Sequence, residues 1–321
     1  MSLIRRITIL SFPLAIGLYV MRDYNQGCQY AGKETLKGKN VIVTGANAGI
    51  GKETVADLAS RGARVFMACR SAERAEAAKA DILKDSHINP DQIIVMKLDL
   101  SSFKSIRSFV KEYKSNENYL HILVNNAGIM WTPFRKTEDG IESQAGVNHF
   151  GHFLLTNLLL DTLKKSSPAR IVTVSSRAHS RATFDIENIN NEKLYSVYRA
   201  YSNSKLMNVM FSRELGKRLK GTGVTTYSLH PGVIFTDLAK EVIPGGILRT
   251  IISYFITPFA KTVKSGAQTT IFCAVNNEVG SQTGLYYSDC AVKAPIPVAE
   301  DDEKSKQLWK FSEEVTGLNR E

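Results

Sequence analysis

Cysteine is scarce in this sequence, which has four in 321 residues. They stand far apart, with no C-x-x-C pair, at Cys28, Cys69, Cys273 and Cys290. A disulfide scaffold and a cysteine-based metal site are therefore poor interpretations, and a reducing compartment fits this usage best. The histidines also lack ligand spacing such as H-E-x-x-H, because His149, His152 and His230 are dispersed among other motifs. We therefore expect no metal ion.

Clusters of basic residues with interleaved aromatics are also absent. The formal net charge is +10, but lysine and arginine are spread along the chain, mostly next to acidic residues. Nucleic-acid binding requires such clusters, so we expect no nucleic-acid partner. A solvated basic surface explains the charge most simply, and the alternative is attraction toward an anionic lipid or an anionic cofactor.

No strongly apolar run reaches the length of a full membrane span. The candidate Ile7–Met21 follows Arg5 and Arg6 and contains Pro13 and Gly17. As a helix it covers about 22 Å, less than the roughly 30 Å of the hydrocarbon core. A secretory signal would need a small-x-small cleavage site after the run, and none follows it. A mitochondrial presequence would be amphipathic, whereas this run is apolar on all sides. We expect a short retained membrane anchor.

From residue 38 onward, short apolar segments alternate with longer helical ones, such as residues 71–85. The expected strands are Val41–Thr44, Arg64–Cys69, Ile93–Leu100, a segment from Ile122, Arg170–Ser176, Val224–Gly232 and LYY near residue 286. This alternation predicts an α/β fold, a Rossmann-type doubly wound parallel sheet with helices on both faces. No linker or repeat divides the chain after residue 35. We expect an anchor or targeting segment at residues 1–34 and one domain at 35–321.

A glycine-rich loop joins the first expected strand to the first expected helix. In VIVTGANAGIGKE the glycines are Gly45, Gly49 and Gly51, spaced G-x-x-x-G-x-G. Glycines permit a tight turn and let the backbone approach a pyrophosphate, and a helix N-terminus offers free N–H groups to phosphates. A plain glycine turn is the alternative. The position directly after the first strand favours a dinucleotide site.

An acidic residue is missing at the end of the second expected strand. Such a residue, about 20 positions after the glycines, would bind the ribose 2′-hydroxyl of NAD. This strand ends in Cys69, Arg70 and Ser71 instead. Arg70 can pair with a 2′-phosphate, with Lys52 assisting, whereas an acid would repel that phosphate. We therefore expect NADP(H), and the alternative is that Arg70 is an ordinary surface cation.

The stretch YSNSK places Tyr201 and Lys205 four positions apart. On a helix this spacing puts both side chains on one face. A single pair of this kind arises by chance in a chain of this composition, so the spacing alone assigns no chemistry. The surrounding motifs must decide.

These motifs occur in the order found in the short-chain dehydrogenases/reductases, which the sequence resembles over about residues 38–290. The matching segments are TGANAGIG, Asp99 after the third strand, NNAG at Asn125–Gly128, the VN of GVNHFGH, VSS, YSNSK and HPG. Within this family the chain looks like the retinol dehydrogenases, on ACR after the second strand, GVNHFGHFLLTNLLL, and HPG followed by V-x-x-T. The apolar run ending in RDY is more loosely similar to the mitochondrial type.

The resemblance implies four catalytic residues. Tyr201 would be the general acid/base, and Lys205 its partner, which also binds the ribose next to the nicotinamide. Ser176 would hold the substrate oxygen, with Ser175 as the alternative. Asn148, within the helix before that strand, would hold a water that links Lys205 to solvent. Lowering a tyrosine pKa from near 10 to about 7 takes about 4 kcal/mol, which the lysine charge and an oxidised nicotinamide would supply.

The resemblance also implies the cofactor-binding residues. They are Gly45, Ala46, Asn47, Ala48, Gly49, Ile50, Gly51, Arg70, Asp99, Asn125, Ala127, Tyr201, Lys205 and Thr236. Thr236, four residues after Gly232, would bond the nicotinamide carboxamide.

The sequence therefore predicts an NADP(H)-dependent oxidoreductase that interconverts a lipophilic aldehyde or ketone and its alcohol, with all-trans-retinal and retinol as the first candidates. A reductase for steroid or lipid-derived carbonyls and a non-catalytic NADP(H)-binding sensor or scaffold are the alternatives. The apolar stretch Val242–Ala260 would cover the substrate, contact the membrane or pack on the core. The expected location is an intracellular membrane, either the endoplasmic reticulum or the mitochondrial inner membrane, and the sequence leaves open whether the protein forms a homo-oligomer.

Overall fold

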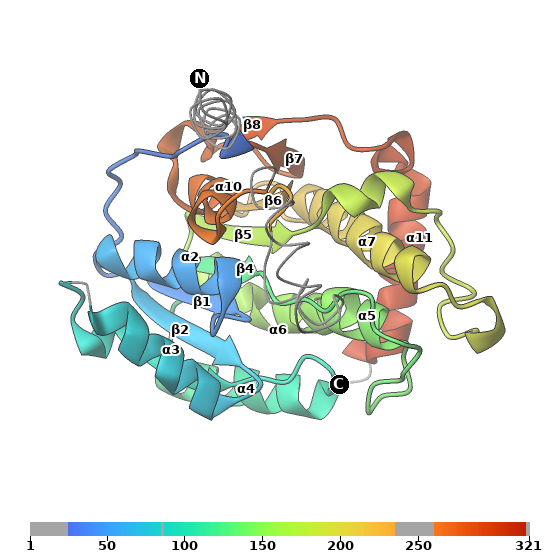
Figure 1. The fold of residues 1–321 in the computed structure, drawn as a ribbon, viewed down its shortest axis with the longest axis horizontal. Helices are drawn as coiled ribbons and strands as arrows, with labels where there is room; N and C mark the ends of the chain where they lie inside the picture. Colours follow the sequence, from blue (N-terminus) through green and yellow to red (C-terminus); the bar gives the residue numbers. More distant parts are fainter. Residues whose placement is uncertain (1–24, 85–86, 235–259, 319–321) are drawn as a thin grey trace, which may run out of the picture.

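The computed structural model describes residues 25–84, 87–234 and 260–318. Its strands are β1 (Asn40–Thr44), β2 (Arg64–Cys69), β3 (Ile93–Lys97), β4 (Ile122–Asn125), β5 (Ala169–Val174), β6 (Val224–His230), β7 (Leu285–Ser288) and β8 (Ala291–Val292). They form one sheet in the order β3-β2-β1-β4-β5-β6-β7-β8 (Figure 1). Neighbouring strands from β3 to β7 are parallel, and β8 pairs antiparallel with β7. The predicted doubly wound sheet is confirmed.

Helices cover both faces of the sheet (Figure 1). They are α2 (Gly49–Ser60), α3 (Ala72–Lys84), α4 (Phe103–Asn116), α5 (Ser143–Ala145), α6 (Gly151–Lys165), α7 (Val197–Arg218), α10 (Val263–Val275) and α11 (Asp302–Thr316). Buried residues of α2, α3 and α10 share one core cluster, and those of α4, α6 and α7 share another. Trp309 of α11 packs edge-on against Phe153 of α6.

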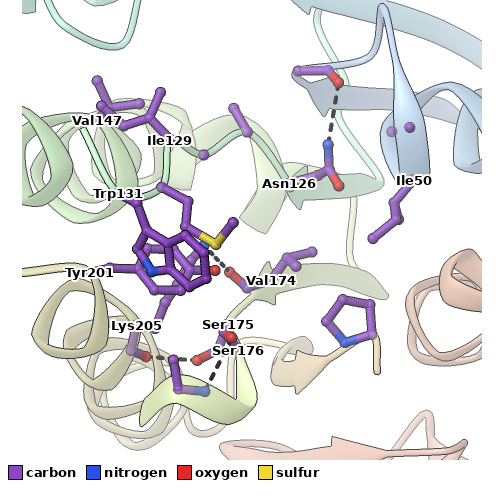
Figure 2. Close-up of a pocket in the computed structure, with 18 of the residues that line it drawn as sticks. Ile50, Asn126, Ile129, Trp131, Val147, Val174, Ser175, Ser176, Tyr201 and Lys205 are labelled. Atoms are coloured by element: carbon purple, nitrogen blue, oxygen red, sulfur yellow. Dashed lines mark hydrogen bonds between the residues drawn. The ribbon is translucent and has the colours of Figure 1, made fainter. Parts of the chain in front are cut away.

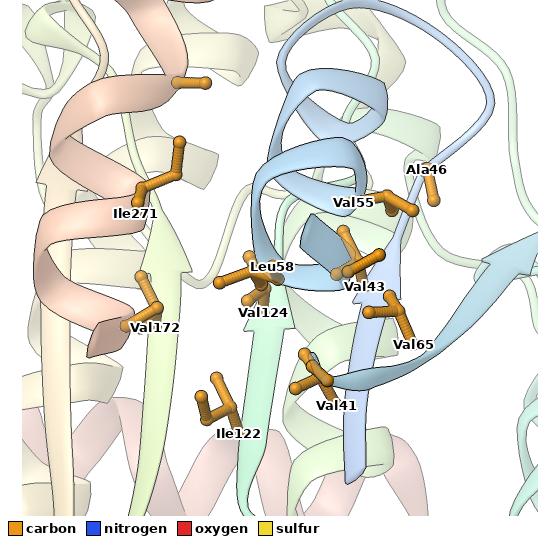
Figure 3. Packing of buried hydrophobic residues seen from close by; sticks show 14 of the residues in the cluster. Val41, Val43, Ala46, Val55, Leu58, Val65, Ile122, Val124, Val172 and Ile271 are labelled. Carbon is orange, nitrogen blue, oxygen red and sulfur yellow. The ribbon is translucent and has the colours of Figure 1, made fainter. Parts of the chain in front are cut away.

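The strands form because apolar side chains alternate between these two cores. Val41 and Val43 of β1 belong to the core under α2, whereas Ile42 faces the core under α4 and α6. Figure 3 shows Val41 and Val43 on the side of the sheet that Val55 and Leu58 of α2 cover. Full burial of one such side chain contributes roughly 1.5–3 kcal/mol. Packing between the two helical layers holds the strands in place, and with them the loops that follow their carboxyl ends.

Some expected strands end earlier than the sequence suggested. β3 ends at Lys97 rather than Leu100, because the Asp99 carboxylate turns the chain by accepting the Ser101 N–H and hydroxyl at 2.9 and 2.6 Å. β5 and β6 likewise end two residues before the expected boundary. β8 was not expected, since two exposed residues carry no hydrophobic alternation. The early ends leave more loop at the edge where ligands bind.

Three of the expected features lie outside the described residues. They are the apolar run Ile7–Met21, Thr236, and all but the last residue of Val242–Ala260. Among the helices that are described, none has the length and apolar character needed to cross a membrane. Close to the end of the third feature, Gln26 accepts the Thr262 N–H at 2.8 Å.

Candidate active site

A cleft of about 1220 Å³ opens at the carboxyl edge of the parallel strands. Its floor comes from the loop after β1, residues 126–131 after β4, residues 174–178 after β5, and the first turns of α7. Figure 2 shows Tyr201, Lys205, Ser175 and Ser176 together, with Asn126 on the other side of the cleft. Ligands of open α/β sheets bind at this edge.

The glycine loop presses directly onto the segment after β4. Gly45 and Gly49 have φ of +63° and +55°, a region that favours glycine. A Cβ on Gly45 would lie 2.8 Å from Ala127 Cα, and one on Gly51 would lie 2.4 Å from the Gly45 carbonyl oxygen. The N-cap residue of α2, Ala48, makes no side-chain cap, so the first N–H groups of this helix stay open to a pyrophosphate. The loop fits a dinucleotide.

Arg70 and Asp99 line the same end of the cleft. Arg74, on the first turn of α3, joins them there, and sequence reasoning missed it although it lies one turn beyond Arg70. Lys52, which was expected to assist Arg70, forms an ion pair with Asp81 of α3 instead. Two guanidinium groups at the end of β2 suit a phosphate on the adenosine ribose.

Two residues of the expected cofactor set face away from the cleft. Ala46 is fully buried in the core. The Asn125 side chain is also fully buried and donates to the Thr156 hydroxyl at 2.9 Å. The next residue, Asn126, lines the cleft instead and donates to the Thr44 carbonyl at 2.8 Å. The packing of α6 on this face of β4 decides this, because Asn125 meets Thr156 only in the folded chain.

Tyr201 and Lys205 lie one turn apart on α7, and both line the cleft. Lys205 Nζ lies 5.8 Å from the Tyr201 ring centre and donates to the Val174 carbonyl at 3.2 Å. The Ser176 side chain lies close enough to the Tyr201 hydroxyl to lower the pKa of that hydroxyl. The Ser175 hydroxyl instead donates to the Lys205 carbonyl at 2.7 Å. Of the two serines, Ser176 is the one that faces Tyr201.

Burial dominates the electrostatics of this pair. It raises the pKa of Tyr201 above its usual value, and the Ser176 side chain opposes the rise. Burial also lowers the pKa of Lys205 to about 8. The sequence suggested that the lysine charge would pull the tyrosine pKa down, but desolvation destabilises the phenolate and the ammonium alike. In the described site the tyrosine is a neutral phenol that can donate a proton.

Asn148 lies in a π-helical turn, Gly146–Phe150, where α5 passes into α6. Its Oδ1 accepts the Ile129 N–H at 2.8 Å, and its Nδ2 donates to the Ile129 carbonyl at 3.0 Å and to the Ser204 hydroxyl at 2.9 Å. A Cβ on Gly128 would lie 3.3 Å from both Asn148 Oδ1 and Lys205 Nζ. The amide therefore ties the loop after β4 to α7 beside Lys205.

His152, four residues beyond Asn148, connects the Asn148 backbone to Thr44, a role that sequence reasoning missed. Its Nδ1 lies 3.0 Å from the Asn148 carbonyl oxygen and its Nε2 lies 2.9 Å from Thr44 Oγ1. A carbonyl only accepts, so Nδ1 carries the proton. Nε2 then accepts the Thr44 hydroxyl, at a shorter distance than the 3.4 Å to the Val124 carbonyl, and Thr44 Oγ1 also accepts the N–H groups of Asn126 and Ala127 at 2.9 Å each. The ring is neutral because burial lowers its pKa to about 4.

This arrangement places one imidazole between β1, the loop after β4 and the helix that carries Asn148. The spacing of four residues between His152 and Asn148 was the available signal, because it puts a side chain beneath the carbonyl of the preceding turn. The ring was set aside in the sequence as a weak metal ligand. Its hydrogen bonds show that His152 instead links Thr44 at the end of β1 to the turn that carries Asn148.

Comparison with known proteins agrees with this geometry. The family model described as short chain dehydrogenase matches residues 39–245. Retinol dehydrogenase 12 of Homo sapiens is 48% identical over 286 residues, 89% of each chain. Retinol dehydrogenase 13 of Mus musculus is 44% identical over 308 residues, 94% of this chain and 91% of its own.

Solved structures show the same fold. An uncharacterized protein from Mycobacterium paratuberculosis is 33% identical, covers 91% of this chain and 98% of its own, and has a TM-score of 0.72. Pseudomonas aeruginosa RhlG in a complex with NADP is 24% identical, covers 78% of this chain and 94% of its own, and has a TM-score of 0.62, which supports the fold alone. The chain therefore belongs to the short-chain dehydrogenase family and is an oxidoreductase related to the retinol dehydrogenases.

Proposed function

We propose that the protein uses NADP(H) to interconvert a lipophilic carbonyl compound and its alcohol, with reduction of all-trans-retinal to retinol as the first candidate. Ser176, Tyr201 and Lys205 all line the cleft, with Lys205 one turn from Tyr201 on α7, and this group of side chains carries the proposal. This group sits beside the glycine loop at the edge where a nicotinamide cofactor binds.

Each residue of the group has a separate task. The cofactor, when bound, supplies or accepts the hydride. Ser176 holds the carbonyl oxygen by a hydrogen bond, and Tyr201 gives that oxygen its proton as general acid. Lys205 holds the ribose beside the nicotinamide and keeps positive charge near the phenol. In the oxidative direction the positive nicotinamide ring would add the charge that phenolate needs in this buried site.

The cofactor preference rests on the charges at the end of β2. Arg70 and Arg74 both line the cleft there. Cys69 and Ser71 flank Arg70, so no carboxylate stands where an NAD-binding acid would. A 2′-phosphate would therefore find two guanidinium groups and no repulsion from an adjacent acid. We assign NADP(H) on this basis.

The substrate assignment rests on relatives and on the lining. Relatives at 44–48% identity are named retinol dehydrogenases. On the substrate side the cleft is lined by Ile129, Met130, Trp131 and Val147. Burying a long polyene against such groups contributes about 25 cal/mol per Å². The second candidate is a steroid or lipid-derived carbonyl, which this lining also accommodates.

The test is kcat/KM on purified protein for all-trans-retinal, a steroid ketone and butanal, each with NADPH and with NADH. We expect retinal with NADPH to be best. A retinal-to-butanal ratio near one would refute the lipophilic substrate, and a preference for the steroid would select the second candidate. NADP(H) binding without turnover of any carbonyl would support the sensor alternative.

We further propose that residues 1–34 attach the domain, residues 35–321, to an intracellular membrane. The apolar run Ile7–Met21 with Arg5 and Arg6 before it supports the proposal, since flanking cations lie at the headgroups. We expect the full-length protein to stay in the membrane fraction after alkaline carbonate treatment, and a protein lacking residues 1–22 to be released. Release of the whole full-length protein would leave only peripheral attachment.

A further inference from the structure

Three arginines surround the outer part of the substrate side of the cleft. They are Arg177, Arg181 and Arg199, all exposed and all lining the cleft. Arg177 directly follows Ser176, and Arg199 precedes Tyr201 by two residues. The backbone segments that place the reacting groups therefore place these guanidinium groups at the mouth of the same cleft.

These arginines have no counter-ion within the described part of the chain. None of their side chains forms an ion pair or a hydrogen bond there, whereas Arg61 pairs with Asp57, Arg64 with Glu117, and Arg218 with Glu214. Among the described residues that line the cleft, the only acid is Asp99. It follows β3, which is the far edge strand from β5 and α7. The mouth is thus a cationic surface that an anion would neutralise.

The cofactor does not account for this charge. Its pyrophosphate fits the N-terminus of α2, and a 2′-phosphate fits Arg70 and Arg74 at the end of β2. Arg177 and Arg181 begin and end a 3₁₀ turn after β5, and β5 is separated from β2 by β1 and β4. Within the described part of the chain, these three arginines are therefore left for a second anion.

An apolar wall lies beside these cations. Trp131 and Tyr198 meet edge to face with ring centres 5.2 Å apart, and both line the cleft. Trp131 holds a left-handed backbone with φ of +57°, and its N–H donates to Gln144 Oε1 at 2.8 Å. A ligand that extends outward from Tyr201 therefore meets aromatic side chains as well as guanidinium groups. This order suits a molecule with an apolar chain and an anionic end.

We propose that the cleft favours lipophilic carbonyl compounds that carry a carboxylate at the end remote from the carbonyl, such as ω-oxo fatty acids. The proposal rests on the proposed function and names a substrate class for the same site. A guanidinium matches a carboxylate in a bidentate pair. NADPH is the reductant. The aldehyde carbon gains one hydride, the carbonyl oxygen gains one proton from Tyr201, and the carboxylate takes no part in the reaction.

The test compares ω-oxododecanoic acid with its methyl ester, at equal chain length, using the full-length protein and NADPH. We expect kcat/KM to be about tenfold higher for the acid, which corresponds to about 1.4 kcal/mol, with the difference shrinking as salt is added. The variant Arg177→Gln/Arg181→Gln/Arg199→Gln should bring the acid-to-ester ratio to about one. Its thermal unfolding should match that of the unchanged protein, because all three side chains are exposed.

The matched control removes the same charge elsewhere, in Lys111→Gln/Arg135→Gln/Lys220→Gln. These three residues are exposed and do not line the cleft, so the acid-to-ester ratio should stay high. Loss of the ratio in the control as well would reduce the effect to net charge and overturn the proposal.

Three further outcomes are decisive. Equal kcat/KM for acid and ester in the unchanged protein would overturn this proposal while leaving the proposed function standing. Reduction of neither aldehyde, nor of retinal, would remove the proposed function and this proposal with it. If the triple variant lost binding to anionic phosphatidylserine vesicles but kept the acid-to-ester ratio, the arginines would belong to a membrane contact and the proposal would fail.

Discussion

The two ends of the cleft are built in different ways. Around the pyrophosphate site the contacts come from backbone: glycines with positive φ, the open N-terminus of α2, and loops braced by Thr44 and His152. At the substrate end they come from exposed side chains, including Trp131 and Tyr198, on segments that follow β4 and begin α7. Backbone contacts tolerate little change, whereas side chains on loops can be exchanged singly. We therefore expect the cofactor end to set the reaction and the substrate end to set which molecule reacts.

Tyr201 stands between these ends, and its loss should have the largest effect. Tyr201→Phe removes only the hydroxyl that carries the proton, so kcat should fall by about 10²–10⁴-fold. NADPH affinity, measured by nucleotide fluorescence titration, should change little. A variant that keeps more than about a tenth of kcat would show that another group supplies the proton.

Arg70 tests the cofactor end alone. Arg70→Asp should weaken NADPH binding by roughly 10- to 100-fold, because a charge-assisted hydrogen bond contributes about 1.5–3 kcal/mol and the new carboxylate repels the phosphate. NADH binding should weaken far less or improve. Arg74→Gln is the neighbouring comparison, with the same sign and a smaller effect. Equal losses for both nucleotides would remove Arg70 from 2′-phosphate recognition.

His152 tests whether the cofactor end needs its internal brace. His152→Phe leaves the Thr44 hydroxyl and the Asn148 carbonyl without their partner, which should cost about 1–3 kcal/mol of stability and lower kcat and NADPH affinity. The control is His149→Phe in the π-helical turn that precedes α6, since His149 is equally buried and bonds Ser312 at 2.9 Å rather than Thr44. Similar stability losses with kinetic losses only in His152→Phe would confirm the brace. Matching kinetics in both variants would make His152 a general core residue.

The lowered pKa of Lys205 predicts how kcat/KM changes at alkaline pH. Burial lowers its pKa to about 8, so the ammonium loses its proton as pH rises through that value. The kcat/KM for carbonyl reduction should then decline above pH 8. A plateau that persists to pH 10 would show that bound cofactor restores the usual lysine pKa or that the charge is not used.

Buried histidines predict how stability responds to acid. Burial lowers the pKa of His149 to about 3 and those of His152 and His230 to about 4, below the unfolded value of about 6.5. Below pH 6.5 the unfolded state binds more protons, so stability falls as pH falls toward 4. The slope approaches about 1.4 kcal/mol per pH unit for each histidine. Urea unfolding of the wild type and of His152→Phe between pH 5 and 7 should show a shallower slope in the variant.

Much of the fold could be predicted because local patterns agree with it. The β-branched run before Gly45 and the helical stretch after it fix the first strand, turn and helix in order. Strand ends were harder to place. Leu98 and Leu100 continue the apolar pattern of β3, and only the turn made by the Asp99 carboxylate shows that the strand has ended. β8 depends on its pairing with β7, which two residues of sequence do not encode.

In the candidate site, too, some features follow from local sequence and others from tertiary packing. The spacing of Tyr201 and Lys205 on one helix is a local property, and the structure reproduces it. Which serine faces the tyrosine is not local, because it depends on α7 packing so that Ser175 reaches the Lys205 carbonyl. The direction of the Tyr201 pKa shift also could not be read from spacing, since burial raises the pKa and exists only in the folded chain.

The sequence by itself determined the order of strands and helices, the glycine loop and the helical Tyr-x-x-x-Lys pair, because each depends on neighbouring residues and on the periods of helix and strand. Tertiary structure alone decided that Asn126 rather than Asn125 reaches the cleft. It also decided that His152 joins Thr44 to Asn148 across 108 residues of chain. The physical reason is burial: contacts between distant segments, and the dielectric around them, exist only once the sheet and its two helical layers have packed.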